Sequence, residues 1–354
     1  MEFSNKKYNI IYADPPWSYN DKRDKHPRLC GGATVHYNTM SIEEIKVSDL
    51  DCVYLTYDEP QKEKFWLDIQ TKIPWAIRVD GVKGSDAAHK AAADASTTER
   101  FILIDGDNIP DEKFFNLQLD FTGKPEIYHR AQYRWKATNI INGLRYGNGG
   151  ISSWTKENVM NMKTHENSEG DDKHTVDFCL DGNDNVYWAM YDCYSTTYPN
   201  HTPFQAWRAG FREGVKMSLN RGVRPSVEEF KESVSSRNLN NLTIWHNVGS
   251  DVENGIWAIY GARLGTYMTM LTDWNPQNVQ WFDNYVEMWE EYKDKDPAYY
   301  AEEVGENLKN KLGLPICTLN ASQSKFFKRH YSTNFHNKGP LITEMEVIRK
   351  IEGW

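Results

Sequence analysis

Between residues 51 and 110 the chain alternates strand-forming and helix-forming segments at a spacing that few folds accommodate. CVYLTY (52–57), WAIRVDGV (75–82) and ERFILIDGDNIP (99–110) are rich in β-branched and aromatic residues and end in turn-forming residues, as strands do. The intervening segments, QKEKFWLDIQTKI and SDAAHKAAADAS, have the length and apolar spacing of helices, and Ser85 is the predicted N-cap of the second. This order predicts an α/β sheet that binds ligands at the carboxyl ends of its strands.

A pair of carboxylates closes the third strand. Asp105 and Asp107 flank Gly106 directly after the apolar run FILI. Two carboxylates on one tight turn can share Mn²⁺ or Mg²⁺, which take oxygen ligands and complete their shell with substrate phosphates. The glycine lets the backbone come close to such a ligand. The alternative is a strand-end turn with two solvated acids.

The stretch that leads to this turn, GSDAAHKAAADASTTERFILIDGDNIP, resembles the approach to the DXD motif of GT-A glycosyltransferases, and later segments resemble glycosyltransferases encoded by phages. The resemblance implies a GT-A-like (Rossmann-like) sheet and a metal-dependent transferase whose donor is a nucleotide sugar, with UDP-sugars preferred. It implies metal binding by Asp105, Asp107 and His201, although a surface-loop histidine is an alternative for His201. The residues expected to bind the donor are Tyr57, Asp58, Glu59, Asp80, Lys90, Asp105, Arg208 and Arg212.

The acceptor side is predicted further along the chain. INGLRYGNGGISSWTKENVMNM (141–162) resembles the Gly-Gly acceptor loop of the same family, which implies acceptor contacts by Gly149, Gly150 and Trp154. Asp171 and Asp172 match a later acidic pair by position and are the expected catalytic residues, with a solvated charge run as the alternative. Phage enzymes of this kind often modify bases in their own DNA, so the preferred acceptor is a hydroxymethylated pyrimidine such as 5-hydroxymethylcytosine.

The N-terminal segment carries a different motif. NIIYADPPW (9–17) resembles the catalytic loop of adenine-N6 methyltransferases, and the resemblance extends over residues 8–50. In that loop the acid and a proline carbonyl accept hydrogens from a flipped adenine, and the aromatic residue stacks on the base. The rest of the chain shows no recognisable S-adenosylmethionine half, so Asp14 and Trp17 are expected to bind the acceptor base. The alternatives are an adenine-N6 DNA methyltransferase that uses Asp14, Pro15, Pro16 and Trp17, or a non-catalytic phage nucleic-acid-binding or assembly protein.

The C-terminal part of the sequence is predicted to be mostly helical. TPFQAWRAGFREGVKM places an apolar stripe and a basic ridge on adjoining helix faces; the stripe is Phe204, Trp207, Phe211 and Val215, and the ridge is Arg208, Arg212 and Lys216. SQSKFFKRHYS (322–332) interleaves Lys325, Lys328 and Arg329 with aromatic residues, which suits nucleic acid, with an exposed basic turn beside core aromatics as the alternative. The expected domains are a methyltransferase-like segment (1–50), a GT-A-like domain (51–220) and a helical region (221–354).

Charge and cysteine content limit the partners and the compartment. Among 354 residues, 50 acids outnumber 41 Lys and Arg to give a net charge of −9, which argues against a surface built mainly to bind phosphate backbones. Five scattered cysteines without a CxxC pair predict reduced thiols in a cytoplasm, the host cytoplasm for a phage protein. No apolar run reaches about 18 residues, so no membrane span is expected. The sequence leaves the oligomeric state open.

Overall fold

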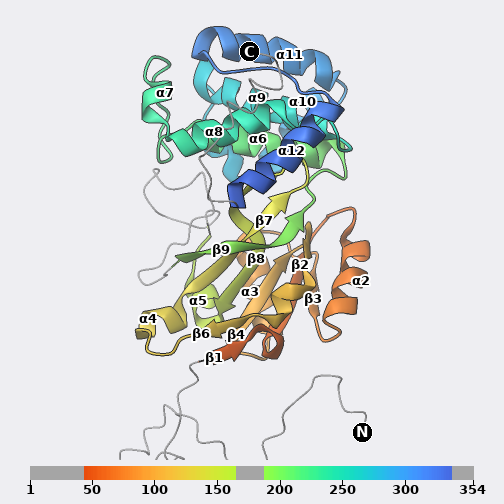
Figure 1. The fold of residues 1–354 in the computed structure, drawn as a ribbon, viewed down its shortest axis with the longest axis vertical. Coiled ribbons are helices and arrows are strands. Elements are labelled where there is room, and N and C mark those ends of the chain that lie inside the picture. The colour runs from red at the N-terminus through yellow and green to blue at the C-terminus, as the bar shows by residue number, and fades with distance from the viewer. Residues whose placement is uncertain (1–43, 165–186, 337–354) are drawn as a thin grey trace, which may run out of the picture.

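The computed structural model describes residues 44–164 and 187–336, which form a mixed α/β structure (Figure 1). A curled mixed sheet fills the lower half of the view and a group of helices the upper half. The prediction of an α/β fold with a largely helical C-terminal region is confirmed at this level. The chain passes from sheet to helices between Thr197 and Pro203, and the predicted domain boundaries stay predictions.

Three parallel strands form one side of the seven-stranded sheet. β2 (Asp51–Thr56) lies between β3 (Ile77–Asp80) and β4 (Arg100–Asp105). These are the strands predicted from the sequence. Because they run in one direction, their carboxyl ends come together at one edge of the sheet, which is the edge that faces the helices (Figure 1).

The other side of the sheet reverses direction. The strand order β3-β2-β4-β8-β7-β9-β5 places β8 (Arg145–Thr155) antiparallel to β4 and to β7 (Gln132–Asn139). β9 (Tyr187–Thr197) runs parallel to β7 and antiparallel to β5 (Asn108–Pro110). A separate small sheet pairs β1 (Glu44–Lys46) with β6 (Gln118–Asp120).

Helices cover both faces of the parallel strands. In β4, Phe101 and Leu103 pack in the cluster that contains α3 (Ser85–Ala95) and α5 (Lys156–Asn161). The alternate residues Ile102 and Ile104 pack in the cluster of the other face, with α2 (Lys62–Lys72) and the 3-10 helix η3 (Glu112–Asn116). This alternation follows from the two-residue repeat of a strand and explains why FILI is apolar throughout.

One predicted helix cap is wrong. Ser85 is the first residue of α3, and Gly84 takes the N-cap position with a φ of +93° and no capping side chain. That left-handed backbone conformation favours glycine. The helix therefore begins one residue earlier than the serine signal suggested.

The helical part is built around one close helix pair. A Cβ atom on Gly210 of α6 (Pro203–Met217) would lie 2.0 Å from the carbonyl oxygen of Ala258 on α9 (Gly255–Leu271). The predicted apolar stripe of α6 is confirmed, because Trp207, Phe211 and Val215 are fully buried. The remaining helices are η2 (Val47–Asp49), α4 (Glu126–Arg130), α7 (Phe230–Ser233), α8 (Ser236–Asn247), η4 (Pro276–Gln280), α10 (Phe282–Tyr292), α11 (Pro297–Leu312) and α12 (Ala321–His336).

The last helix fastens the helical part to the sheet. Lys328 of α12 donates to the carbonyl oxygens of Ile140 and Ile141 at the β7–β8 turn, and its ammonium lies 2.7 Å from the Asp251 carboxylate. Phe327 is fully buried in the helical core. The segment is a helix and not the exposed basic turn of the alternative prediction. Phe327 is a core aromatic residue, and Lys325 and Arg329 are exposed, as that alternative expects, whereas Lys328 is largely buried and paired.

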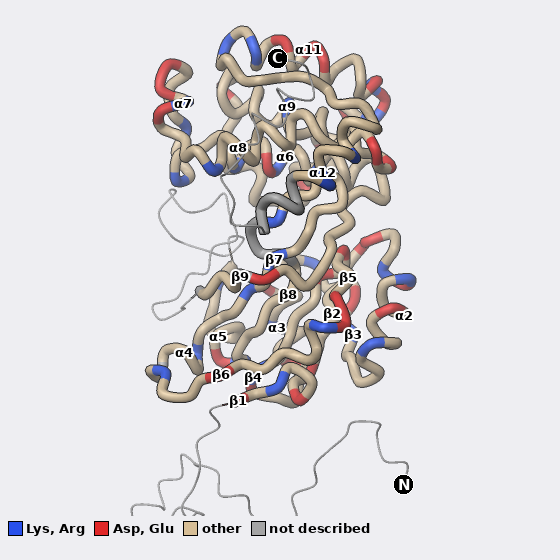
Figure 2. Tube along the Cα trace, in the orientation of Figure 1, with Lys and Arg blue, Asp and Glu red and all other residues tan. Residues whose placement is uncertain are grey.

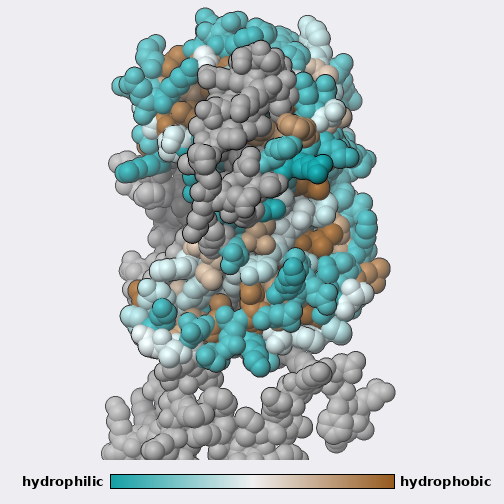
Figure 3. Space-filling model, in the orientation of Figure 1, coloured by the Kyte–Doolittle hydropathy of each residue, from teal (hydrophilic) through white to brown (hydrophobic). Residues whose placement is uncertain are grey.

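The surface shows no membrane element in the described ranges. The face in Figure 3 is mostly hydrophilic, and its hydrophobic residues gather in small separate patches. Within residues 44–164 and 187–336, no helix has the length and apolar content needed to cross a bilayer.

Candidate functional site

A cavity of about 1200 Å³ lies where the carboxyl ends of the parallel strands face the helices. Its walls come from the turns after β2 and β4, the start of α3, parts of β7 and β8, and one face each of α6, α8 and the η4–α10 segment. Figure 2 shows charged residues of both signs at this level of the molecule. The sequence-predicted residues that line it are Tyr57, Asp58, Glu59, Asp105, Asp107, Gly150, Trp154, Arg208 and Arg212.

The acidic turn after β4 is held by hydrogen bonds on three sides. The Tyr54 hydroxyl donates to the Gly106 carbonyl oxygen at 2.8 Å. The Asp107 carboxylate accepts from the Asn108 side-chain amide at 2.9 Å and from the Thr197 hydroxyl at 3.0 Å. Strands β5 and β9 thus fix the direction of this carboxylate, and Tyr54 of β2 holds the backbone of the turn beside it.

Carboxylates crowd around the turn. Burial and the neighbouring charge of Asp107 raise the pKa of Asp105 to about 7, with Glu59 adding to the shift and Arg134 opposing it. Burial also raises the pKa of Glu59, although its carboxylate accepts from the Tyr57 backbone N–H at 2.8 Å. Asp105 lies below the outer surface of the molecule, and its side chain reaches solvent only through the cavity. Negative charge is therefore concentrated at one point of the cavity wall.

Two glycines let polar groups approach this turn. A Cβ on Gly106 would lie 2.6 Å from the Glu59 carboxyl carbon. Gly150 in β8 has a φ of +76°, and a Cβ there would lie 2.1 Å from the Asn108 amide nitrogen. The predicted acceptor glycine thus lies against the predicted metal turn. Gly149 precedes it in β8.

A basic wall faces the same cavity from α6. Arg208 lies with its guanidinium 4.9 Å from the Phe282 ring centroid. Arg212 and Lys216 form ion pairs with Glu213 at 3.6 and 3.3 Å. All four charged residues line the cavity, so the structure brings the ridge predicted on α6 to the same space as the acidic turn.

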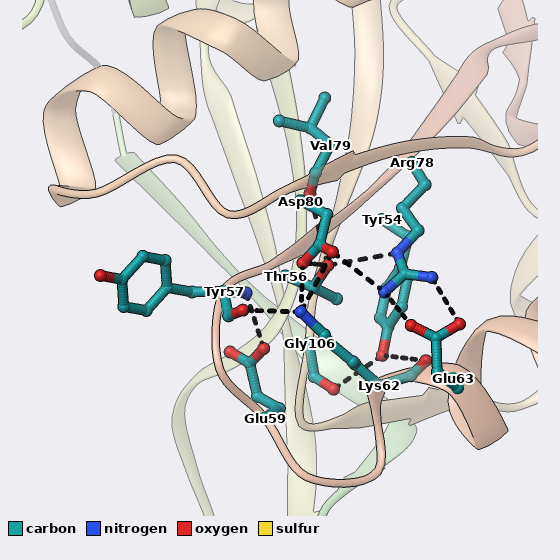
Figure 4. Close-up of polar contacts among 10 residues, drawn as sticks. All are labelled: Tyr54, Thr56, Tyr57, Glu59, Lys62, Glu63, Arg78, Val79, Asp80 and Gly106. Atoms are coloured by element: carbon teal, nitrogen blue, oxygen red, sulfur yellow. Dashed lines mark hydrogen bonds and ion pairs between the residues drawn. The ribbon is translucent and has the colours of Figure 1, made fainter.

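The end of β2 divides into a cavity side and a structural side (Figure 4). Tyr57 and Glu59 line the cavity, and the Tyr57 ring points away from the neighbouring polar network. Asp80 belongs to that network and lies outside the cavity lining. Its carboxylate accepts from Lys62 at 2.8 Å and from Thr56 at 2.7 Å, so it joins β3 to β2 and α2.

Two other predicted residues lie outside the cavity lining. Lys90 forms an ion pair with Asp86 at 2.7 Å, one turn earlier on α3. His201 packs against the rings of Phe65 and Tyr198, with centroids 5.6 and 6.1 Å away. Burial lowers the pKa of His201, and its Nε2 atom has no hydrogen-bond partner among the described residues.

The predicted metal ligands are only partly brought together. In the part of the chain that the structure describes, no three His, Cys, Asp or Glu side chains are grouped so as to hold a metal ion by themselves. Asp105 and Asp107 share one turn, and His201 is separate from it. The predicted residues Asp14, Trp17, Asp171 and Asp172 lie outside the described residues.

Several cavity residues escaped the sequence predictions. Arg134 in β7 lies with its guanidinium 5.1 Å from the Trp154 ring centroid. Its strand also carries Gln132 and Lys136, so charge alone did not single it out. Residues on α8 and around the start of α10 carried no sequence signal, because only packing brings them to the sheet. They are Arg237, Asn238, Asn241, Trp281 and Phe282.

Neither protein-family models nor curated proteins match this chain. The chemistry of the cavity is therefore argued from its own residues. A carboxylate turn and a guanidinium wall on opposite structural units can hold an anionic ligand together with a cation, and the aromatic residues between them offer apolar surface to a ring.

Proposed function

We propose that the protein is a metal-dependent glycosyltransferase that moves a sugar from a nucleotide sugar, with UDP-sugars preferred, to a hydroxyl group of an acceptor. The observation that carries this proposal is that the Asp105–Asp107 turn and the Arg208–Arg212 ridge line one cavity. A nucleoside diphosphate needs a cation and guanidinium groups around its phosphates, and these two walls supply the protein side of both.

The acidic turn fits a divalent cation. Asp105 and Asp107 offer carboxylate oxygens, and the buried Asn108 Oδ1 atom has no hydrogen-bond partner among the described residues. The close carboxylates repel one another, which is part of why the pKa of Asp105 is raised, and a bound cation would relieve that repulsion. When bound, Mn²⁺ or Mg²⁺ neutralises negative charge on the departing diphosphate.

The topology also supports a GT-A-like arrangement. The DXD turn ends the strand at which parallel pairing stops, and the next strand, β8, runs antiparallel with Gly150 against the turn. Donor and acceptor sides would then meet at Asp105. The exposed aromatic side chains of Tyr57 and Trp281 line the same cavity and offer flat surfaces to a base or sugar, whereas Trp154 is buried in the cavity wall.

The proposed transfer forms one bond and breaks one. The acceptor oxygen bonds to the anomeric carbon, while the bond from that carbon to the diphosphate oxygen breaks and its electron pair leaves with the nucleoside diphosphate. The acceptor hydroxyl gives its proton to a carboxylate or to water. Arg208 and Arg212 would orient and stabilise the diphosphate. The preferred acceptor remains a hydroxymethylated base in DNA.

Calorimetry with UDP tests the donor half directly. We expect Mn²⁺-dependent binding by the wild type and by Asp294→Ala, which changes an exposed aspartate on the surface. Asp107→Ala is expected to lose most of that binding. Equal UDP affinity in EDTA and in Mn²⁺, or an unaffected Asp107→Ala variant, would remove the metal site. A panel of nucleotide sugars, read by diphosphate release with and without hydroxymethylated DNA, then identifies the sugar.

A further inference from the structure

One face of α8 lines the cavity although nothing in the donor site described above uses it. Arg237, Asn238, Asn241 and Trp245 recur at helical spacing and all line the cavity. Leu144 from the β7–β8 turn region and Met217 at the end of α6 also line the cavity and pack in the same buried core cluster as Trp245. This wall combines a cation, two amides and apolar side chains.

Asn241 is the unusual residue of this face. The residue is only 7% exposed and lines the cavity, no described residue donates to or accepts from its amide group, and that group is not among the buried polar atoms left without a partner, so it reaches the solvent of the cavity. Asn247, two turns later on α8, is buried as well, but its amide donates to the carbonyl oxygens of Thr243 and Pro315 and accepts from the Cys317 N–H. The Asn247 amide is thus satisfied within the fold, whereas the Asn241 amide faces the cavity, where a ligand can pair with it.

The cavity is large enough for two ligands. Its volume of about 1200 Å³ exceeds the range of roughly 300–1,000 Å³ that is usual for a single small-molecule site. A transferase must hold donor and acceptor at the same time. The acidic turn and α6 account for the donor, so the α8 face is left for the second ligand.

We propose that the α8 face is the acceptor subsite and that it binds a nucleotide, with the base edge at Asn241 and a phosphate at Arg237. A side-chain amide can donate to and accept from one base edge at once, and a guanidinium matches a phosphate. The role of this face as the acceptor subsite rests on the proposed glycosyltransferase function. Nucleotide binding at the α8 face does not depend on that function.

A free nucleotide and a nucleotide within a strand present the same chemistry, so both serve as probes. We would measure the affinity of 5-hydroxymethyl-dCMP and of a short single-stranded oligonucleotide with one 5-hydroxymethylcytosine, each in the presence of Mn²⁺ and saturating UDP. Asn241→Ala and Arg237→Ala are expected to weaken binding of the better probe at least about tenfold. Asn240→Ala changes a neighbouring asparagine of α8 outside the cavity lining and is expected to bind as the wild type does.

The outcomes separate this subsite from the donor site. Wild-type protein that binds neither probe, or two variants that bind like the wild type, would overturn the inference. Binding of the oligonucleotide alone identifies a nucleic-acid acceptor, and equal binding of both probes identifies the nucleotide itself as sufficient. If neither the wild type nor any variant binds UDP, but the α8 variants still bind the probe less tightly than the wild type, the donor proposal is wrong and the α8 subsite is supported. Arg237 is exposed, so Arg237→Ala remains informative even if Asn241→Ala misfolds.

Discussion

The carboxyl end of the sheet and the helical part line the same cavity, yet they use glycine in opposite ways. In the helices, Gly210 and Gly261 remove side chains so that two backbones touch; a Cβ on Gly261 would lie 2.1 Å from the Trp207 carbonyl oxygen. At the sheet, Gly106 and Gly150 remove side chains so that polar groups reach the acidic turn. The helix glycines allow close packing of two backbones, and the sheet glycines leave space for polar groups beside the acidic turn.

The two regions also treat charge differently. Arg263 is fully buried in the helices, but its guanidinium donates to the His246 and Ala301 carbonyl oxygens and to the Thr318 hydroxyl. Asp105 and Glu59 at the sheet have raised pKa values, partly from nearby carboxylates. Buried charge in the helices is satisfied internally, whereas the sheet end tolerates repulsion, as functional sites often do.

The largest effect of a single substitution is expected where two helix backbones touch. Helix propensity alone would make Gly261→Ala stabilising by about 1 kcal/mol. We expect instead a loss of about 2–4 kcal/mol in the free energy of unfolding, because the new methyl group forces α6 and α9 apart. Urea unfolding measures this loss.

A glycine in open space provides the control. Gly123 has a φ of +65° and no atom near the position of a Cβ, so Gly123→Ala should cost only about 1 kcal/mol of backbone strain. A stabilised Gly261→Ala protein would show that the helix pair is not closely packed, and the contrast between the two regions would disappear.

Acid should weaken the helical part through His246. Burial and the charge of Arg263 lower the pKa of His246 to about 3. Between about pH 6.5 and pH 3 this histidine is protonated in the unfolded chain but not in the folded chain. The free energy of unfolding therefore falls with decreasing pH by up to about 1.4 kcal/mol per pH unit in this range.

Unfolding free energies measured from pH 7 to pH 4 check this slope, with His246→Gln as the comparison. The glutamine keeps a polar group near the Thr266 hydroxyl, which lies 3.0 Å from the histidine Nε2, but it does not titrate. A slope as steep in His246→Gln as in the wild type would assign the acid sensitivity to other groups.

The smallest effect is expected at the sheet end, and it has the opposite sign. The folded pKa of Asp105 is raised to about 7, so stability falls as the pH rises from the pKa of the unfolded chain towards 7 and stays lowered above that pH. In EDTA, Asp105→Asn should therefore stabilise the protein at pH 8 but not at pH 4. The gain should stay below about 1 kcal/mol, because cavity solvent screens the charge. Thermal unfolding at both pH values measures it, and destabilisation at pH 8 would show that the carboxylate has a structural role.

Local sequence patterns were enough to find three of the seven strands of the main sheet and the acidic turn. β-Branched runs gave β2, β3 and β4, apolar spacing gave α2 and α6, and the acids after FILI marked the turn that lines the cavity. These signals are local, since burial of one face imposes a repeat of two or 3.6 residues on any chain. The predicted start of α3 was wrong by one residue, because Gly84, with a positive φ, takes the N-cap position that was expected for Ser85.

Contacts between distant segments were decided only by the tertiary structure. Asp80 and Lys90 looked equivalent to the cavity residues in sequence, but neighbouring charges Lys62 and Asp86 hold them elsewhere. Asn241 carried no signal at all, because an asparagine on a helix gains meaning only from what lies opposite. Which faces of α6 and α8 meet the sheet depends on the packing of whole helices, and that packing sums many weak contacts across the chain that no short segment encodes.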